Sequence, residues 1–126
     1  MGKFTFKKEE RLNKEKWIQE LFEKGSSFIL YPFRVVYLPH PDPMHPAHQV
    51  LISVSTRHFK KAVDRNTIKR RIREGYRLNK LKILLPGKWL IAYIYIAKEM
   101  IPSEMIHKKL VHTFEQLQRN KHDEKK

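Results

Sequence analysis

A dense cluster of cations lies between residues 57 and 82. This segment contains eleven Lys or Arg residues and only two acids, Asp64 and Glu74. Cations at this density neutralise phosphates and release the counterions that surround a polyanion. Arg in particular suits bidentate contact with phosphate oxygens. The chemistry that this segment indicates is therefore binding of a nucleic acid.

The pattern within the segment predicts a helix over about residues 62–80, with its polar donors on one face. At about 100° per residue, seven side chains fall within an arc of roughly 140°: Arg65, Asn66, Lys69, Arg70, Arg73, Arg77 and Lys80. A neighbouring face suited to packing on a sheet carries Ile68, Ile72, Gly75, Tyr76 and Asn79. Like charges four residues apart repel each other, so a helix built only for stability would intersperse Glu. A solvated charged face is the alternative, but the near absence of acidic partners favours a face that binds a polyanion.

Residues that could perform catalysis are not grouped in this sequence. The 13 Asp and Glu residues are scattered, mostly beside Lys or Arg, whereas magnesium-dependent nuclease sites need converging carboxylates. The four glycines lie far apart and form no phosphate-binding loop. One proline-rich loop holds possible zinc ligands at a spacing that matches no known site, namely His40, Asp42, His45 and His48. We therefore predict no catalytic residue in the protein, and no metal or cofactor bound by the protein alone.

The composition indicates one folded, strongly basic domain. The chain has 126 residues, with 27 Lys or Arg against 13 Asp or Glu, and a formal charge of +14. A hydrophobic share of 40% is ordinary for a globular domain and argues against a disordered polycation. Cysteine is absent, which excludes disulfides and thiolate metal sites. Without a long apolar run or a secretory signal, a soluble protein in the cytoplasm is expected.

The elements that must position the basic helix can be predicted from hydrophobic periodicity. A first helix is predicted over 14–24, with Asn13 as N-cap and Gly25 as its C-terminal stop. Extended chain follows over 28–38 and is interrupted at Pro32. Alternation in this segment places Phe33, Val35 and Tyr37 on one face of a strand. Arg34, Val36 and Leu38 fall on the other face.

The rest of the chain supplies two more strands and a last helix. Strands are predicted over 50–55 and 88–96, and Pro102 and Ser103 open the last helix. In the first of these strands, alternation separates Val50, Ile52 and Val54 from Leu51, Ser53 and Ser55. The resulting order, α-β-β-β-α-β-α, predicts an α+β fold with helices packed on one small sheet. We expect a single domain over 1–126, ordered over about 4–117 and ending in a basic tail over 118–126.

The basic helix and the strand before it resemble the signature of the protein component of bacterial ribonuclease P. In that family a serine-bearing strand precedes a helix with the motifs Arg-Asn-Arg, Ile-Lys-Arg and Ile-Arg. The matching residues are Ser53-Val54-Ser55, Arg65-Asn66-Thr67, Ile68-Lys69-Arg70 and Ile72-Arg73-Glu74. Thr67 replaces the second Arg of the first motif, so one phosphate contact is expected to be lost or to come from Lys60 or Lys61. Weaker matches extend the resemblance to roughly residues 4 to 117.

The resemblance implies a fold, a function and two sets of site residues. The sheet would be mostly antiparallel, with about four strands packed with three helices, a left-handed β-α-β crossover and the second-domain fold of a small-subunit ribosomal protein. The RNA subunit of the enzyme would bind Arg65, Asn66, Lys69, Arg70, Arg73 and, on the same stripe, Arg77. The 5′ leader of precursor tRNA would lie between the first helix and the sheet, against Phe22, Tyr37, Ser53, Ser55 and Arg57.

The implied protein is an accessory subunit of an endoribonuclease. It would promote substrate and metal binding, while the RNA subunit performs the hydrolysis and the ribonucleoprotein requires Mg²⁺. The protein would be a monomer with one RNA subunit, precursor tRNA as substrate and no obligate protein partner. Two alternatives remain open, a ribosomal or other structured-RNA-binding protein and a stand-alone metal nuclease. The missing carboxylate cluster disfavours the nuclease.

Two assignments among the aromatic residues stay open from the sequence. Phe22 and Tyr37 could stack on unpaired bases, or both could be core residues. On the first helix, either Trp17 or Ile18 could face the leader cleft.

Overall fold

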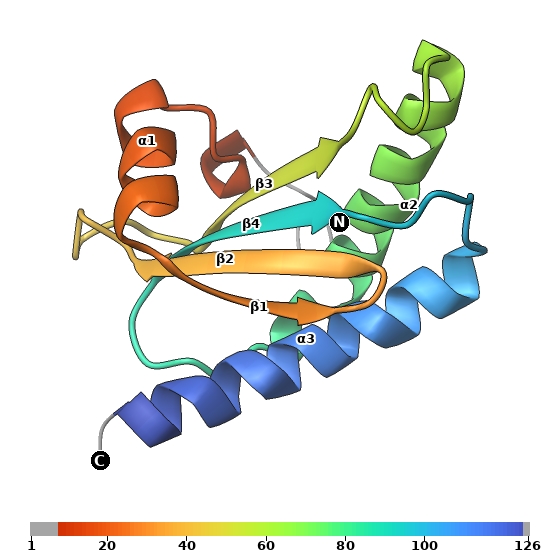
Figure 1. Cartoon of the computed structure of the whole chain (residues 1–126). Coiled ribbons are helices and arrows are strands. Elements are labelled where there is room, and N and C mark those ends of the chain that lie inside the picture. Colours follow the sequence, from red (N-terminus) through yellow and green to blue (C-terminus); the bar gives the residue numbers. More distant parts are fainter. Residues whose placement is uncertain (1–7, 125–126) are drawn as a thin grey trace.

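Three helices enclose one four-stranded sheet in three layers, with α1 on one face and α2 and α3 on the other (Figure 1). The computed structural model describes residues 8–124. Its helices are α1 (Glu15–Lys24), α2 (Ala62–Asn79) and α3 (Ser103–Glu124), with short 3-10 turns at Lys8–Glu10 and Lys80–Lys82. Its strands are β1 (Ser26–Leu30), β2 (Phe33–Pro39), β3 (Gln49–Val54) and β4 (Trp89–Tyr95). The predicted α+β class and element order are confirmed, although α3 continues past residue 117, where a tail was expected.

The sheet has the order β1-β2-β4-β3. β1 pairs antiparallel with β2, β2 pairs antiparallel with β4, and β3 pairs parallel with β4. The mostly antiparallel sheet of four strands is therefore confirmed. Because β3 and β4 are parallel neighbours, α2 must carry the chain from one end of the sheet back to the other. This crossover is what places the basic helix against the sheet.

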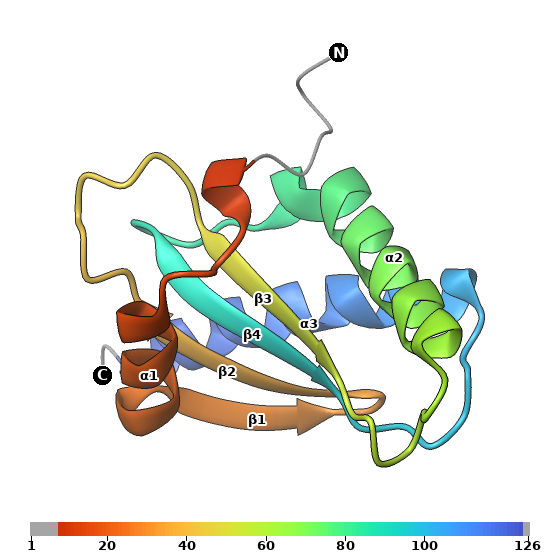
Figure 2. The same ribbon diagram turned by 90° about the horizontal axis from the view of Figure 1, so that it is seen from above.

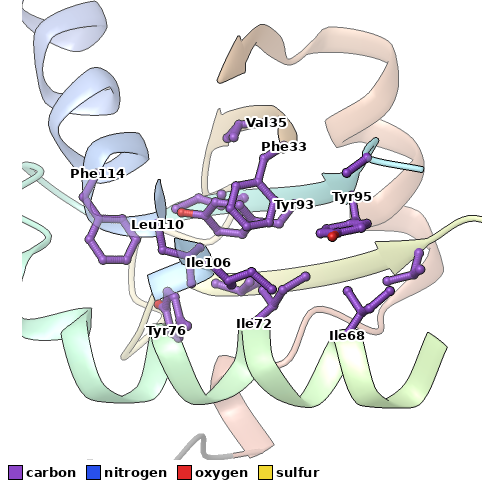
Figure 3. Packing of buried hydrophobic residues seen from close by; sticks show 14 of the residues in the cluster. Phe33, Val35, Ile68, Ile72, Tyr76, Tyr93, Tyr95, Ile106, Leu110 and Phe114 are labelled. Atoms are coloured by element: carbon purple, nitrogen blue, oxygen red, sulfur yellow. The ribbon is translucent and has the colours of Figure 1, made fainter. Parts of the chain in front are cut away.

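The main core lies between the sheet and the pair α2 and α3 (Figure 3). The predicted strand face of Phe33, Val35 and Tyr37 is buried there, as is the predicted packing face of α2 with Ile68 and Ile72. Burying each such side chain stabilises the fold by about 1.5–3 kcal/mol. This packing fixes the rotation of α2 about its axis, and so decides which of its side chains reach solvent.

A smaller core holds α1 against the other face of the sheet. It contains Leu12, Leu21, Val36, Leu90 and Ala92. Figure 2 shows that α1 covers one end of the strands and leaves their other end uncovered. The outer surface of the sheet is therefore only partly occupied.

Gly25 ends α1 as predicted, and the structure shows why a glycine is needed there. A Cβ at this position would lie 2.4 Å from the Leu21 carbonyl oxygen and 2.9 Å from the Tyr37 carbonyl oxygen. Backbone atoms cannot give way, so a larger residue would push α1 off the sheet. The predicted N-cap was wrong: Lys14 rather than Asn13 takes that position, without a side-chain capping bond.

The loop between β2 and β3 is fastened to the sheet by histidines. The Trp89 N–H donates to Nδ1 of His48 at 3.0 Å. Burial first, and then the positive charge of Lys88, lower the pKa of His48 to about 4. Burial also lowers the pKa of His40, which hydrogen-bonds Gln49 through Nε2 at 3.0 Å. Both imidazoles are therefore held neutral in the folded protein at neutral pH.

Acid is consequently expected to destabilise the fold through His48. Below about pH 6.5 the unfolded chain binds a proton that folded His48 does not bind until about pH 4. The free energy of unfolding should therefore fall between these values, by on the order of 2 kcal/mol from this residue. Urea denaturation at pH 7 and pH 4.5 measures the fall. The free energy of unfolding of the His48→Gln variant should fall less than that of the wild type. That of His58→Gln, changed at an exposed position, should fall as much as that of the wild type. Equal falls in all three proteins would contradict the assignment.

No helix within residues 8–124 is both long enough and apolar enough to cross a membrane.

Candidate nucleic-acid interface

The cationic side of α2 faces solvent because the opposite side of the helix is fully packed. Gly75 permits this packing, since a Cβ there would lie 2.6 Å from Cδ1 of Leu110 and 2.7 Å from Cδ2 of His107. Asn79 is partly buried, and its side-chain amide donates to the Gly75 carbonyl at 2.9 Å. Because α2 packs closely against α3, its charged side chains cannot point inward and instead extend into solvent.

The middle of α2 presents a concave group of cations. Arg70, Arg73 and Arg77 line a shallow cavity of about 240 Å³ together with Glu74. Nη2 of Arg77 lies 3.7 Å from Oε1 of Glu74, too long for a strong bond. The side chains of Lys69, Arg70 and Arg73 make no hydrogen bond or ion pair within the residues that the structure describes. Several guanidinium groups could therefore converge on one phosphate.

Asn66 is exposed one turn before this cavity and completes the group. We call Asn66, Lys69, Arg70, Arg73 and Arg77 the α2 cationic site.

The two ends of the predicted stripe have structural roles. Nη1 of Arg65 donates to the carbonyl oxygens of Phe59 at 2.7 Å and Lys60 at 2.9 Å, which holds the connector before α2. Nζ of Lys80 pairs with Glu10 at 2.9 Å, and the two side chains are only 14% and 8% exposed. The sequence did not predict these contacts of Arg65 and Lys80. Contacts outside the helix distinguish these two residues from the rest of the stripe.

A row of four residues crosses the sheet near the ends of β1, β3 and β4 and the start of β2. These are the strand ends that α1 leaves uncovered (Figure 2). Strand register aligns Ile29 of β1, Arg34 of β2, Ile94 of β4 and Ser53 of β3. Ile29 is 70% exposed, Arg34 and Ser53 are also exposed, and Ile94 is half-buried. We call these four residues the open row. It combines apolar surface with one cation and one hydroxyl, which suits an unpaired nucleic-acid strand.

Most of the residues predicted to bind the leader lie where they could contribute to this face. Phe22 is 48% exposed on α1, so it is not a core residue. Ser53 belongs to the open row. Ser55 and Arg57 follow the end of β3, where the Arg57 N–H donates to Oγ of Ser55 at 3.0 Å. Arg57 is exposed, in keeping with its predicted place at a basic edge.

The assignment of Tyr37 to the leader surface is corrected by the structure. Tyr37 is only 5% exposed and belongs to the main core, on the opposite face of the sheet from α1. Its ring lies against Phe28 and Trp89, and its hydroxyl accepts a bond from Nδ2 of Asn120 at 3.3 Å. The Tyr37 hydroxyl is therefore bonded to α3 inside the fold.

Three members of the open row were missed as candidates, namely Ile29, Arg34 and Ile94. The alternation of β2 did place Arg34 opposite Phe33 and Val35. No pattern in the sequence shows that α1 leaves this end of the sheet uncovered.

Trp17 and the histidine loop pack on each other. Trp17 lies edge-on to His40 at 4.6 Å between ring centroids, and the rings of His40 and His45 stack at 4.4 Å. Ile18 and Trp17 both pack partly buried against the smaller core. Within the described residues, no three His, Asp or Glu side chains are grouped as metal ligands.

Comparison with known proteins bears directly on these surfaces. Residues 6–118 match the profile of the family described as Ribonuclease P. The chain belongs to the ribonuclease P protein family. A ribonuclease P protein component from Porphyromonas gingivalis is 42% identical over 77 residues, which are 61% of this chain and 56% of that relative. The aligned part thus spans little more than half of that relative.

Relatives and solved structures that match over more of the chain support the same family. The component from Geobacillus kaustophilus is 34% identical over 110 residues, covering 84% of each chain. The ribonuclease P protein from Thermotoga maritima has a TM-score of 0.71 at 26% identity, covering 85% of this chain and 96% of that structure. The protein from Staphylococcus aureus has a TM-score of 0.67 at 28% identity, covering 86% and 94%. This chain therefore has the same overall fold as these solved ribonuclease P proteins.

The departure from the family motif at Thr67 has a structural consequence. Oγ1 of Thr67 donates to the Val63 carbonyl at 2.9 Å, within its own helix. Thr67 therefore does not stand in for a long cation. Lys60 and Lys61 are exposed in the connector before α2 and could supply the charge.

Proposed function

We propose that this protein is the RNA-binding subunit of ribonuclease P and assists removal of the 5′ leader from precursor tRNA. The observation that carries the proposal is the α2 cationic site, in a member of the ribonuclease P protein family. The side chains of Lys69, Arg70 and Arg73 lack partners within the described residues and share one side of α2, where Lys69 is half-buried and the two arginines are exposed. A folded protein gains nothing from holding such repelling charges together, whereas the catalytic RNA subunit would supply the phosphates.

In this proposal the open row and its surroundings bind the leader. Phe22 and Ile29 offer exposed apolar surface, Arg34 offers a cation for phosphates, and Ser53 offers a hydroxyl. An unpaired strand lies on such a surface with little sequence preference, because every base has an apolar face. The leader is what distinguishes precursor from mature tRNA, so this surface would give the complex its preference for the precursor.

The hydrolysis itself is assigned to the RNA subunit with Mg²⁺. By neutralising phosphates, the α2 cationic site would lower the repulsion between RNA subunit and substrate and so reduce the magnesium that the complex needs. The protein would act as one copy with one RNA subunit.

Reconstitution tests the proposal. The purified protein alone is expected to cleave no precursor tRNA, because the described residues bring no carboxylates together as metal ligands. Protein plus its RNA subunit is expected to release the leader at low magnesium, where RNA alone is slow. Gel analysis of end-labelled precursor measures both. Cleavage by protein alone would contradict the proposal, and tight RNA binding without any stimulation of cleavage would favour a structured-RNA-binding protein of another kind.

A further inference from the structure

A second surface feature lies at the end of the sheet, beyond the open row. A cavity of about 530 Å³ opens between the β1–β2 turn and the first two turns of α3. Its lining includes Tyr31 and Pro32 from the turn, Glu99 and Met100 from the loop before α3, and Met105 and Lys109 from α3. None of these residues belongs to the α2 cationic site or to the open row.

The walls of the cavity are apolar and accessible. Tyr31 is 51% exposed, and Met100 and Met105 are 38% and 46% exposed. An aromatic ring and two polarisable thioethers are the side chains on which planar groups pack well. Such exposure of three large apolar residues around one cavity is unfavourable in water unless a ligand covers them.

The loop that forms the floor is held in place before any ligand binds. The Tyr95 hydroxyl donates to the Glu99 carbonyl at 2.6 Å and accepts from the Ile101 N–H at 3.1 Å. Nη1 of Arg71 reaches from α2 to the Ile101 carbonyl at 2.9 Å. These bonds fix the segment 99–101, so the cavity is pre-formed and its ligand would not bear the cost of ordering it.

One polar group in the cavity has unused bonding capacity. The Tyr31 hydroxyl donates to Oε1 of Glu99 at 3.1 Å. Oε2 of Glu99 has no hydrogen-bond partner in the part of the chain that the structure describes. A carboxylate oxygen accepts hydrogen bonds from amino groups and repels phosphate, so the group that enters the cavity should be a donor rather than an anion.

We propose that this cavity binds one unpaired RNA base that carries an exocyclic amino group, at the end of the strand held by the open row. The inference rests on the proposed function for the presence of an RNA strand. Tyr31 and the methionines would stack on the base, and Oε2 of Glu99 would accept from its amino group, as carboxylates do from cytosine N4. Lys109 lies at the same cavity and would face the adjoining phosphate.

Location and charge favour an RNA base over an apolar peptide side chain. Ile29, 70% exposed, lies at the end of β1, and Tyr31 follows β1 two residues later, so the cavity is close along the chain to the open row. The chain carries a net charge of +14, which favours a polyanion over an uncharged peptide as its ligand. Uracil fits less well, because two carbonyl oxygens flank its ring N–H and would approach the carboxylate.

Methionine methyl groups give a direct readout in the full-length protein. The chain has four methionines, of which Met100 and Met105 line the cavity and Met44 lies 86% exposed in the loop before β3. With ¹³C-methyl methionine, titration with a short cytidine oligonucleotide should shift the Met100 and Met105 resonances and leave Met44 unchanged. A uridine oligonucleotide of the same length should bind the cavity several-fold more weakly.

Three variants test the assigned contacts. Tyr31→Ala should weaken binding of the cytidine oligonucleotide to the cavity by about 5-fold or more. Tyr31→Phe keeps the stacking surface and should retain most of the affinity. Glu99→Gln should abolish the preference for cytidine over uridine. Equal binding of the two oligonucleotides by the wild type, or no shift at Met100 and Met105, would overturn the proposal.

The outcome is separable from that of the proposed function. If the reconstituted complex cleaves precursor tRNA but no oligonucleotide shifts the cavity methionines, only the base site is wrong. Shifts of Met100 and Met105 by an acidic peptide with an apolar side chain, and not by cytidine, would likewise overturn the RNA assignment in favour of a protein partner.

Discussion

Replacing Arg70 and Arg73 together by alanine is expected to weaken binding of the ribonuclease P RNA subunit by on the order of 100-fold at low salt. Both side chains are exposed in the middle of the α2 cationic site and make no bond within the described residues. Each would lose one charge-assisted contact with phosphate. The slope of log affinity against log salt should therefore fall by about two units.

The fold should survive this double substitution, because neither side chain packs in the core. Thermal unfolding of the variant should therefore match the wild type. A matched control removes two charges elsewhere, with Lys16→Ala on α1 and Arg119→Ala on α3, both exposed. The control should change affinity much less, because its charges lie outside the α2 cationic site. If both double variants lost the same affinity, only the overall charge of the protein would matter and the α2 cationic site would have no special role.

Replacing Tyr37 by alanine is expected to lower the free energy of unfolding by about 3 kcal/mol or more. The ring is 5% exposed and packs between Phe28 and Trp89 under α3, so its removal leaves a cavity in the main core. Tyr37→Phe removes only the bond from Asn120 and should cost about 1 kcal/mol or less. Urea denaturation of the two variants measures the difference.

Replacing Phe22 by alanine is expected to affect RNA binding rather than stability. Phe22 is 48% exposed, so its loss should alter stability by less than about 1 kcal/mol. It should nevertheless weaken binding of leader-bearing tRNA by about 5-fold or more and spare mature tRNA. A Tyr37→Ala protein as stable as the wild type, or a Phe22→Ala protein that loses both tRNAs equally, would contradict these roles.

Much of the fold follows from local patterns in the sequence. The buried face of α2, with Ile68, Ile72 and Tyr76, is visible as a helical period because residues three and four apart share one side. The alternation Phe33, Val35, Tyr37 likewise shows which residues of β2 lie together. Gly25 marks the end of α1. These patterns depend on neighbours within about eight residues, so the sequence contains them directly.

The candidate site could be predicted only in part. The cations of α2 were evident, but the role of Arg65 depends on the carbonyl groups of Phe59 and Lys60, and the role of Lys80 depends on Glu10, 70 residues earlier. Such partners leave no periodic signal. The cavity beside Tyr31 and Met105 is of the same kind, since the β1–β2 turn and α3 meet only after the chain has folded.

Local patterns were enough to predict a basic α+β fold with much of its charge on one helix, because charge and hydrophobic period can be read within a short segment. Which surfaces remain accessible became known from the packing of distant segments. A period shows that Phe33, Val35 and Tyr37 share a face and that Arg34 lies opposite, but it does not show what covers each face. Packing of α2 and α3 buries Tyr37, and the short reach of α1 leaves Arg34 exposed. Which face is covered depends on contacts between distant segments, and these alone separate core from binding surface.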